Sequence, residues 1–174
     1  AAGVWRPEEA AADPGPGLFE FRPYRKGDGT TVRDALRAPY YAGHGYAVLR
    51  VDMRGSGDSD GVLTDEYTTQ EHDDAVACIA WIAAQPWCDG NVGMMGISWG
   101  GFNSLQVAAR QPPALKALVV IGFTDDRYAD DVHYMGGCVL TSQMLPWPAV
   151  MHAHNALPPH PRSVGDPWRD LCFA

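Results

Sequence analysis

The sequence has little clustered positive charge and no long hydrophobic run. Its longest basic stretch is the pair Arg25-Lys26, and its formal net charge is -8 at pH 7. Nucleic-acid sites need clustered lysines and arginines, so this charge balance argues against nucleic acid as a partner. A membrane-spanning helix needs about 20 consecutive apolar residues. Because no apolar run approaches that length, we expect no membrane segment.

Cysteine is also scarce, and nothing in the sequence groups metal ligands. The chain contains four cysteines, Cys78, Cys88, Cys138 and Cys172. They form no C-x-x-C pair, which argues against a zinc site. His152 and His154 form an H-x-H pair, but no third ligand is suitably spaced. We therefore expect no metal and no cofactor, and the unpaired thiols favour a reducing, cytoplasmic compartment.

Segments of strand and helix character alternate up to residue 121. Strands are predicted at residues 3–7, 18–21, 46–52, 91–95 and 117–121. Helices are predicted at residues 33–43, at residues 101–110, and from a capping box at residues 68–71 to Pro86. The last three strands are apolar, as expected of strands buried in a parallel sheet. This order predicts an α/β fold with a mostly parallel sheet and flanking helices.

The pattern is weaker after residue 121. Residues 125–134 are expected to be helical. Residues 146–161 hold five of the fourteen prolines, so a loop is expected there. Asp166 and Pro167 are predicted to be the N-cap and the first residue of a further helix.

The central motif is Gly96-Ile97-Ser98-Trp99-Gly100. It has the G-x-S-x-G pattern of a nucleophile elbow, in which a serine occupies a sharp turn between a strand and a helix. We expect glycine at positions 96 and 100 because a Cβ there would collide with the neighbouring strand or helix. The helix that follows directs free N–H groups and its positive end toward the site. The motif therefore predicts that Ser98 is a nucleophile beside an oxyanion-binding site.

Four separate motifs carry a resemblance to a known family. They are residues 23–26 (PYRK), 52–59 (DMRGSGDS), 87–94 (WCDGNVGM) and 96–101 (GISWGG). Together they resemble the CocE/NonD hydrolases, the cocaine-esterase-like and X-Pro dipeptidyl-peptidase-like branch of the α/β-hydrolases. The resemblance runs from about Trp5 to the end of the chain. It implies an α/β-hydrolase fold that is incomplete here.

The resemblance also implies roles for individual residues. Ser98 would attack an acyl carbonyl, while the backbone N–H of Trp99 and the hydroxyl of Tyr24 would bind the oxyanion. Asp52 and Arg54 would organise a loop beside the elbow. Residues 1–124 would form the N-terminal part of the hydrolase domain. Residues 125–174 would begin a helical cap that shapes the acyl pocket.

A serine hydroxyl is a poor nucleophile without a base. In this fold the acid and the histidine follow the serine, and the resemblance places both beyond the cap. The candidates within the chain are the acids Asp125, Asp126, Asp130 and Asp131 and the histidines His133, His152, His154 and His160. Asp125 and Asp126 follow a strand end, where a triad acid can lie, whereas the histidines are equally compatible with surface or cap positions. We therefore expect a truncated chain without its triad partners, slow or inactive alone, with an unpaired sheet edge that favours aggregation.

The leading prediction is a serine hydrolase acting on a small-molecule or peptide ester or amide. The resemblance does not separate a carboxylesterase from an X-Pro dipeptidyl peptidase, and it allows a homo-oligomer of the full-length protein. A nucleotide-binding oxidoreductase is suggested by Gly55-Ser56-Gly57, but the dinucleotide motif would need glycine where Asp60 stands. A third alternative is a catalytically inactive hydrolase-like fragment or binding protein.

Overall fold

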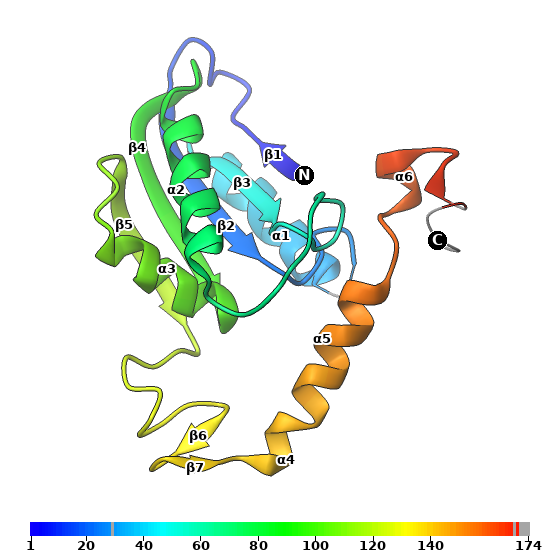
Figure 1. Ribbon diagram of the computed structural model, residues 1–174. Coiled ribbons are helices and arrows are strands. Elements are labelled where there is room, and N and C mark those ends of the chain that lie inside the picture. Colours follow the sequence, from blue (N-terminus) through cyan, green and yellow to red (C-terminus); the bar gives the residue numbers. More distant parts are fainter. Residues whose placement is uncertain (29, 169, 171–174) are drawn as a thin grey trace.

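The computed structural model describes residues 1–28, 30–168 and 170. A five-stranded sheet in the order β1-β3-β2-β4-β5 forms its centre (Figure 1). The strands are β1 (Ala2–Trp5), β2 (Gly15–Arg22), β3 (Ala47–Asp52), β4 (Cys88–Ile97) and β5 (Leu115–Ile121). β1 runs antiparallel to β3, whereas β2–β3, β2–β4 and β4–β5 are parallel pairs. The predicted α/β fold with a mostly parallel sheet is confirmed.

Three helices cover the two faces of this sheet. Figure 1 shows α2 (Thr69–Ala83) and α3 (Trp99–Ala109) on one face and α1 (Thr31–Ala42) on the other. Successive side chains of a strand point to opposite faces. In β2, Phe19 and Phe21 therefore join the apolar core beneath α2 and α3, while Glu20 and Arg22 face α1.

The core on the α2 and α3 face is apolar. Its largest fully buried aliphatic and aromatic side chains are Phe19, Met53, Ile79, Ile82, Met94, Val92 and Val107. Each such side chain contributes roughly 1.5–3 kcal/mol by leaving water. This core fixes the elbow because β4 and α3, which flank Ser98, both contribute to it.

The face toward α1 holds a buried ionic cluster instead. Two carboxylates there, those of Glu20 and Asp34, are surrounded by the guanidinium groups of Arg22, Arg33, Arg37 and Arg50. Asp34 is 1% exposed and lies 3.0 Å from Arg50. Burial raises the pKa of Asp34, but hydrogen bonds from Arg33 and Arg22 outweigh it and lower the pKa below its ordinary value.

The structure corrects the predicted burial of β5. This strand lies at one edge of the described sheet and pairs with β4. Leu118 and Val120 are half-buried, and Val119 and Ile121 are 53% and 51% exposed. The apolar sequence of residues 117–121 therefore did not mean that this strand is buried on both faces. A hydrophobic pattern predicts a strand, but it does not tell whether the strand lies in the centre or at the edge of the sheet.

The predicted helix at residues 125–134 is wrong. Asp126 accepts hydrogen bonds from the backbone N–H groups of Tyr128 and Ala129, both at 3.1 Å, and this local turn replaces a helix. The short strands β6 (Tyr134–Met135) and β7 (Cys138–Val139) then pair as a hairpin.

The predicted loop at residues 146–161 is also wrong in its first part. After α4 (Thr141–Met144) comes the helix α5 (Pro146–Ala156), followed by α6 (Pro161–Val164). Pro146 and Pro148 lie in the first turn of α5, where backbone N–H groups have no partner within the helix, so the prolines are tolerated.

The further helix predicted from Asp166 lies partly outside the described residues, and Asp166 and Pro167 themselves occupy a turn. No helix within the described part of the chain has the length and apolar character needed to cross a membrane.

Candidate active site

The candidate site lies at the carboxyl end of the parallel strands, where ligands bind in open α/β sheets. Three neighbouring strands deliver residues to this edge. Asp52 ends β3, Tyr24 follows β2, and Ser98 follows β4. The sheet order places β2 between β3 and β4. The fold therefore brings together the segments that carry three of the four sequence motifs.

Ser98 occupies the predicted turn between β4 and α3. Its backbone has φ 57° and ψ -119°, which is a strained conformation for a residue with a side chain. The turn is held by hydrogen bonds on both sides. The N–H of Ser98 donates to the carbonyl of Ile121 at 2.9 Å, and its carbonyl accepts from Gly101 and Phe102 at 2.7 and 3.0 Å.

The glycines beside Ser98 are not equivalent. A Cβ on Gly96 would lie 2.2 Å from the carbonyl carbon of Gly100, so the expected collision exists there. A Cβ on Gly100 would come no closer than 3.6 Å to the carbonyl oxygen of Phe21, an ordinary contact, so the collision expected at position 100 is wrong. Gly101 is tighter, because a Cβ on it would lie 3.0 Å from the carbonyl oxygen of Ile121.

Tyr24 and Trp99 meet beside Ser98. The backbone N–H of Trp99 donates a hydrogen bond of 3.1 Å to the hydroxyl oxygen of Tyr24. Burial raises the pKa of Tyr24, although hydrogen bonds with the Ser98 side chain and the Trp99 backbone oppose the rise. The phenol is therefore protonated at neutral pH and can donate to an oxyanion.

The side chain of Glu71 in α2 contacts α3, the helix that follows Ser98. Its carboxylate accepts from the indole N–H of Trp99 at 3.1 Å, from the side-chain amide of Asn103 at 3.0 Å, and from the backbone N–H of Tyr67 at 2.9 Å. Burial raises the pKa of Glu71, and these donors partly offset the rise. Thr68 accepts from the N–H of Glu71, which is one half of the predicted capping box, whereas the Glu71 carboxylate bonds the N–H of Tyr67 and not that of Thr68. That the capping glutamate also reaches α3 could not be predicted from the local motif.

A cavity of about 570 Å³ lies beside this site. It is lined on one side by the loop at residues 63–67 and Trp99, and on the other by residues of the segment 127–155. Its aromatic and thioether walls include Tyr67, Trp99, Tyr134, Trp147, Met144 and Met151. Such a cavity suits an apolar group of a ligand.

One side of the cavity is polar. The imidazole of His133 lies 3.4 Å from the carboxylate of Glu66. The guanidinium of Arg127 lies 4.7 Å from the ring centres of both Tyr67 and Phe102. These polar residues can orient the polar end of a ligand. Glu66 was not among the site residues predicted from the sequence.

The candidate triad partners do not assemble around Ser98. Asp130 and Asp131 line a smaller hollow of about 170 Å³ together with Ser98, but Asp131 is paired with Arg127 at 2.8 Å. His133 faces Glu66, and His160 takes part in contacts with Asp58 and Arg162. Within the described ranges, no hydrogen bond joins Ser98 to any of the eight candidates. Those ranges also contain no cluster of three metal-ligating side chains.

Asp52 organises the loop after β3, as predicted. It accepts from the backbone N–H and the ammonium of Lys26 at 2.6 and 3.0 Å, and from the N–H of Asp58 at 3.0 Å. Arg54 instead ties the loop to α2 through two 2.7 Å bonds to Asp74. A Cβ on Gly57, whose φ is +60°, would lie 2.3 Å from Asp52. The close packing around Asp52 explains this glycine without a bound nucleotide.

Comparison with known proteins supports the resemblance found in the sequence. The sequence profile of the X-Pro dipeptidyl-peptidase (S15) family matches residues 1–171. Cocaine esterase from Rhodococcus sp. is 32% identical over 155 residues, which cover 87% of this chain and 26% of that protein. The chain thus spans about a quarter of the length of this relative.

Solved structures agree in fold. The crystal structure of a CocE/NonD family hydrolase from Staphylococcus aureus matches with a TM-score of 0.71 and 25% identity, covering 88% of this chain and 30% of that one. An aminopeptidase from a marine-sediment Thaumarchaeota archaeon matches with a TM-score of 0.72 at 22% identity, covering 88% and 28% of the two chains. These matches confirm the resemblance to the CocE/NonD and X-Pro dipeptidyl-peptidase-like hydrolases and the α/β-hydrolase fold.

Proposed function

Because the chain belongs to the X-Pro dipeptidyl-peptidase (S15) family, we propose that the protein carrying it is a serine hydrolase that cleaves acyl esters or amides. One observation carries this proposal. The N–H of Trp99 and the hydroxyl of Tyr24 lie 3.1 Å apart directly beside Ser98. In this contact the Trp99 N–H donates to the Tyr24 oxygen. An oxyanion bound here would take that oxygen's place as acceptor of the N–H and would also accept from the Tyr24 hydroxyl.

The proposed reaction has two steps. The hydroxyl oxygen of Ser98 attacks the acyl carbon, its proton passes to a general base, and the carbonyl oxygen becomes an oxyanion bound by Trp99 and Tyr24. The bond to the alcohol or amine then breaks, the leaving group takes up a proton, and an acyl-enzyme remains. Water adds to the acyl-enzyme and returns the proton to Ser98 as the acid departs. We assign no general base among the described residues.

The lining of the cavity supports a substrate class. Its aromatic and thioether walls favour a small-molecule or peptide acyl group with a substantial apolar part. Residues 125–174 are accordingly assigned to the start of a cap, since Trp147 and Met151 of this segment complete the wall opposite Trp99. Residues 1–124 carry the nucleophile and both oxyanion donors. The free thiols of Cys78, Cys88 and Cys138 fit a reducing compartment such as the cytoplasm.

Turnover of p-nitrophenyl esters by the full-length protein, expressed from its gene, tests the function. Hydrolysis above background that is lost in Ser98→Ala is the expected result. Ser142→Ala, a change at an exposed serine of α4, is the matched control and should behave as the unmodified protein does. Equal hydrolysis by the unmodified protein and Ser98→Ala would refute the proposal.

The alternative of an inactive hydrolase-like binding protein has one observation in its favour. None of the candidate acids and histidines within the described part of the chain is hydrogen-bonded to Ser98, and a serine without a base is weakly nucleophilic. Complete absence of ester hydrolysis and of labelling by a fluorophosphonate would support this alternative. Labelling at Ser98 would exclude it.

A further inference from the structure

The side chains of three consecutive residues after β2 contact three different parts of the molecule. Tyr24 reaches the elbow, where it accepts from Trp99. Arg25 reaches the end of α5, and Lys26 reaches the carboxylates of Asp52 and Asp58. The backbone of Arg25 has φ +60°, a left-handed conformation that residues with side chains rarely adopt. Strain of this kind persists only where the surrounding contacts determine the conformation.

Arg25 holds the carboxyl end of α5. Its guanidinium donates to the carbonyls of Leu157 at 2.8 Å, of His154 at 3.4 Å, and of Pro158. The last carbonyls of a helix lack partners within the helix, and a cation there also complements the helix dipole. Arg25 is 4% exposed and is paired with Asp28, so its side chain is fixed on both sides.

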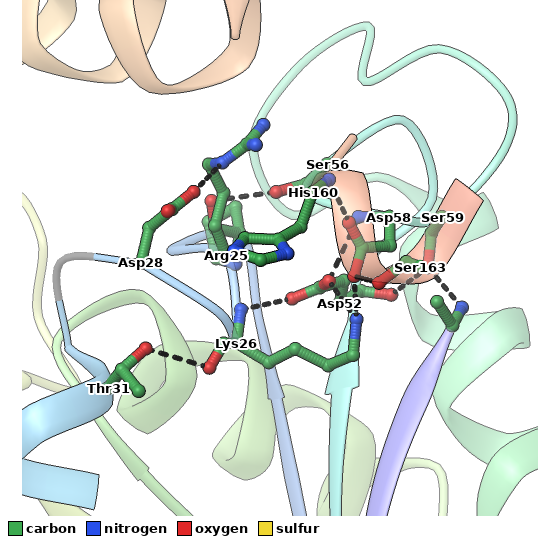
Figure 2. A network of polar contacts seen from close by, with 12 residues as sticks. Arg25, Lys26, Asp28, Thr31, Asp52, Ser56, Asp58, Ser59, His160 and Ser163 are labelled. Atoms are coloured by element: carbon green, nitrogen blue, oxygen red, sulfur yellow. Dashed lines mark hydrogen bonds and ion pairs between the residues drawn. The ribbon is translucent and has the colours of Figure 1, made fainter. Parts of the chain in front are cut away.

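Asp58 holds the next part of the same segment. Its carboxylate accepts from the backbone N–H of His160 at 2.7 Å and from the hydroxyl of Ser163 at 2.6 Å. Figure 2 shows Asp58 between these groups and the ammonium of Lys26, which also reaches Asp52. The end of α5 and the start of α6 are therefore anchored to the two loops that follow β2 and β3.

The other end of α5 reaches the candidate active site. Trp147 and Met151 line the large cavity, and the ring of Trp147 meets that of Tyr24 edge-on with 6.2 Å between their centres. Figure 1 shows α5 on the side toward which the arrowhead of β2 points. One helix thus carries a cavity wall at its first turns and the contacts with Arg25 at its last.

We propose that Arg25 is a positioning residue that holds the cavity wall α5 and the oxyanion donor Tyr24 in one fixed relation, with Asp58 as the second anchor. The backbone at position 25 sets the direction of Tyr24, and the side chain at position 25 sets the place of α5. Loss of the side chain therefore frees α5 directly, and it frees Tyr24 through Trp147 of α5, whose ring packs edge-on against that of Tyr24. The catalytic consequence rests on the proposed function, whereas the structural coupling does not.

Residue-resolved amide hydrogen exchange of the full-length protein tests the coupling. In Arg25→Gly the side chain is removed while the left-handed backbone remains favourable. We expect exchange to become about tenfold faster or more at residues 153–156 and also at the amide of Trp99, because charge-assisted hydrogen bonds are lost. The Trp99 amide reports on Tyr24, since Tyr24 is its hydrogen-bond acceptor.

Two further variants keep the test decisive. Arg25→Asn also tolerates a left-handed backbone but is less flexible than glycine, so it should show the same changes. If either variant does not fold, Arg25→Lys keeps the charge without the planar guanidinium and should show smaller changes in the same direction. Lys116→Gln, at an exposed lysine of β5 that bonds the nearby carbonyl of Pro113, removes one positive charge elsewhere, and as the control it should leave both sets of amides unchanged.

The outcomes separate the two proposals. Faster exchange at residues 153–156 alone would overturn the coupling, and unchanged exchange at both places would overturn the anchoring. In an active protein, Arg25→Gly should lower kcat and raise KM for an ester substrate, because the oxyanion donor and the cavity wall both move. The amount of active protein is measured by labelling Ser98 with a fluorophosphonate, and kcat is normalised to it. If this kcat and KM are both unchanged in Arg25→Gly, the catalytic role is contradicted. Absence of activity would refute the proposed function while the exchange data still decide the coupling.

Discussion

The backbone N–H of Trp99 donates to the hydroxyl oxygen of Tyr24 at 3.1 Å, although 75 positions separate the two residues in the sequence. This contact joins the loop after β2 to the first residue of α3. Trp99 is buried and Tyr24 is half-buried. An oxyanion beside Ser98 would replace the Tyr24 oxygen as the acceptor of the Trp99 N–H, so this hydrogen bond opens before both groups donate to the oxyanion.

Removal of the Tyr24 hydroxyl should slow catalysis with little effect on folding. We expect Tyr24→Phe in the full-length protein to lower kcat for a p-nitrophenyl ester by about 10²–10³-fold, the usual effect of losing one oxyanion donor. KM should change much less. Tyr40→Phe, at a tyrosine that is 62% exposed on α1, is the control. A kcat within twofold of the unmodified protein would exclude Tyr24 from the oxyanion hole.

Loss of the Glu71 carboxylate should destabilise the elbow helix. Glu71→Ala leaves the donors of Trp99, Asn103 and Tyr67 without their acceptor, and we expect the free energy of unfolding in urea to fall by at most about 1–3 kcal/mol per unpaired donor group. Glu71→Gln should lose less, because its amide oxygen can still accept and burial of a charge is avoided. Equal stability of Glu71→Ala and the unmodified protein would contradict this role.

Loss of Asp34 should be more costly. It is 1% exposed among the guanidinium groups of Arg22, Arg33, Arg37 and Arg50, so Asp34→Ala leaves buried positive charge uncompensated. We expect the free energy of unfolding to fall by about 3–5 kcal/mol. Asp73→Ala, which breaks an exposed pair with Arg110, should change it by at most about 1 kcal/mol. Similar losses in the two variants would contradict the assigned importance of the buried cluster.

The contacts of Asp58 predict a pH dependence of stability. Burial raises its pKa, but donors from Lys26, Ser163 and His160 outweigh burial and lower the pKa from 3.8 to about 2. The folded protein therefore binds this proton less readily than the unfolded chain. The stabilisation is present above pH 3.8 and is lost as the pH falls toward 2.

Measurement of the unfolding free energy against pH checks this sign. Asp58→Asn should reduce the slope between about pH 4 and pH 2 by up to about one proton per molecule. The pKa of Lys26 is raised, so its ammonium stays charged throughout that range and does not itself contribute to the slope. An unchanged slope in Asp58→Asn would show that Asp58 is not held in its charged form by these contacts.

Local patterns were sufficient to predict the parallel sheet and the turn at Ser98. The alternation of apolar strands with helices defines such a sheet, and G-x-S-x-G between a strand and a helix defines the turn. Both signals lie within short stretches of sequence. The capping box at Thr68 was predictable for the same reason.

The missed features depend on contacts that no short stretch records. Arg25 meets the carbonyl of His154 across 129 positions, and Glu71 meets Asn103 across 32. The prolines at 146 and 148 indicated a loop, yet their place in the first turn makes them compatible with α5. Ile121 and its neighbours were apolar enough to suggest burial, but exposure depends on what covers the edge of the sheet.

Reaction of the full-length protein with a fluorophosphonate, followed by mass mapping of the adduct, tests the central claim most directly. We expect one adduct per chain, located on Ser98, absent in Ser98→Ala and formed more slowly in Tyr24→Phe. An adduct on another residue, or ester hydrolysis that persists without modification of Ser98, would contradict the claim that Ser98 is the nucleophile of this protein.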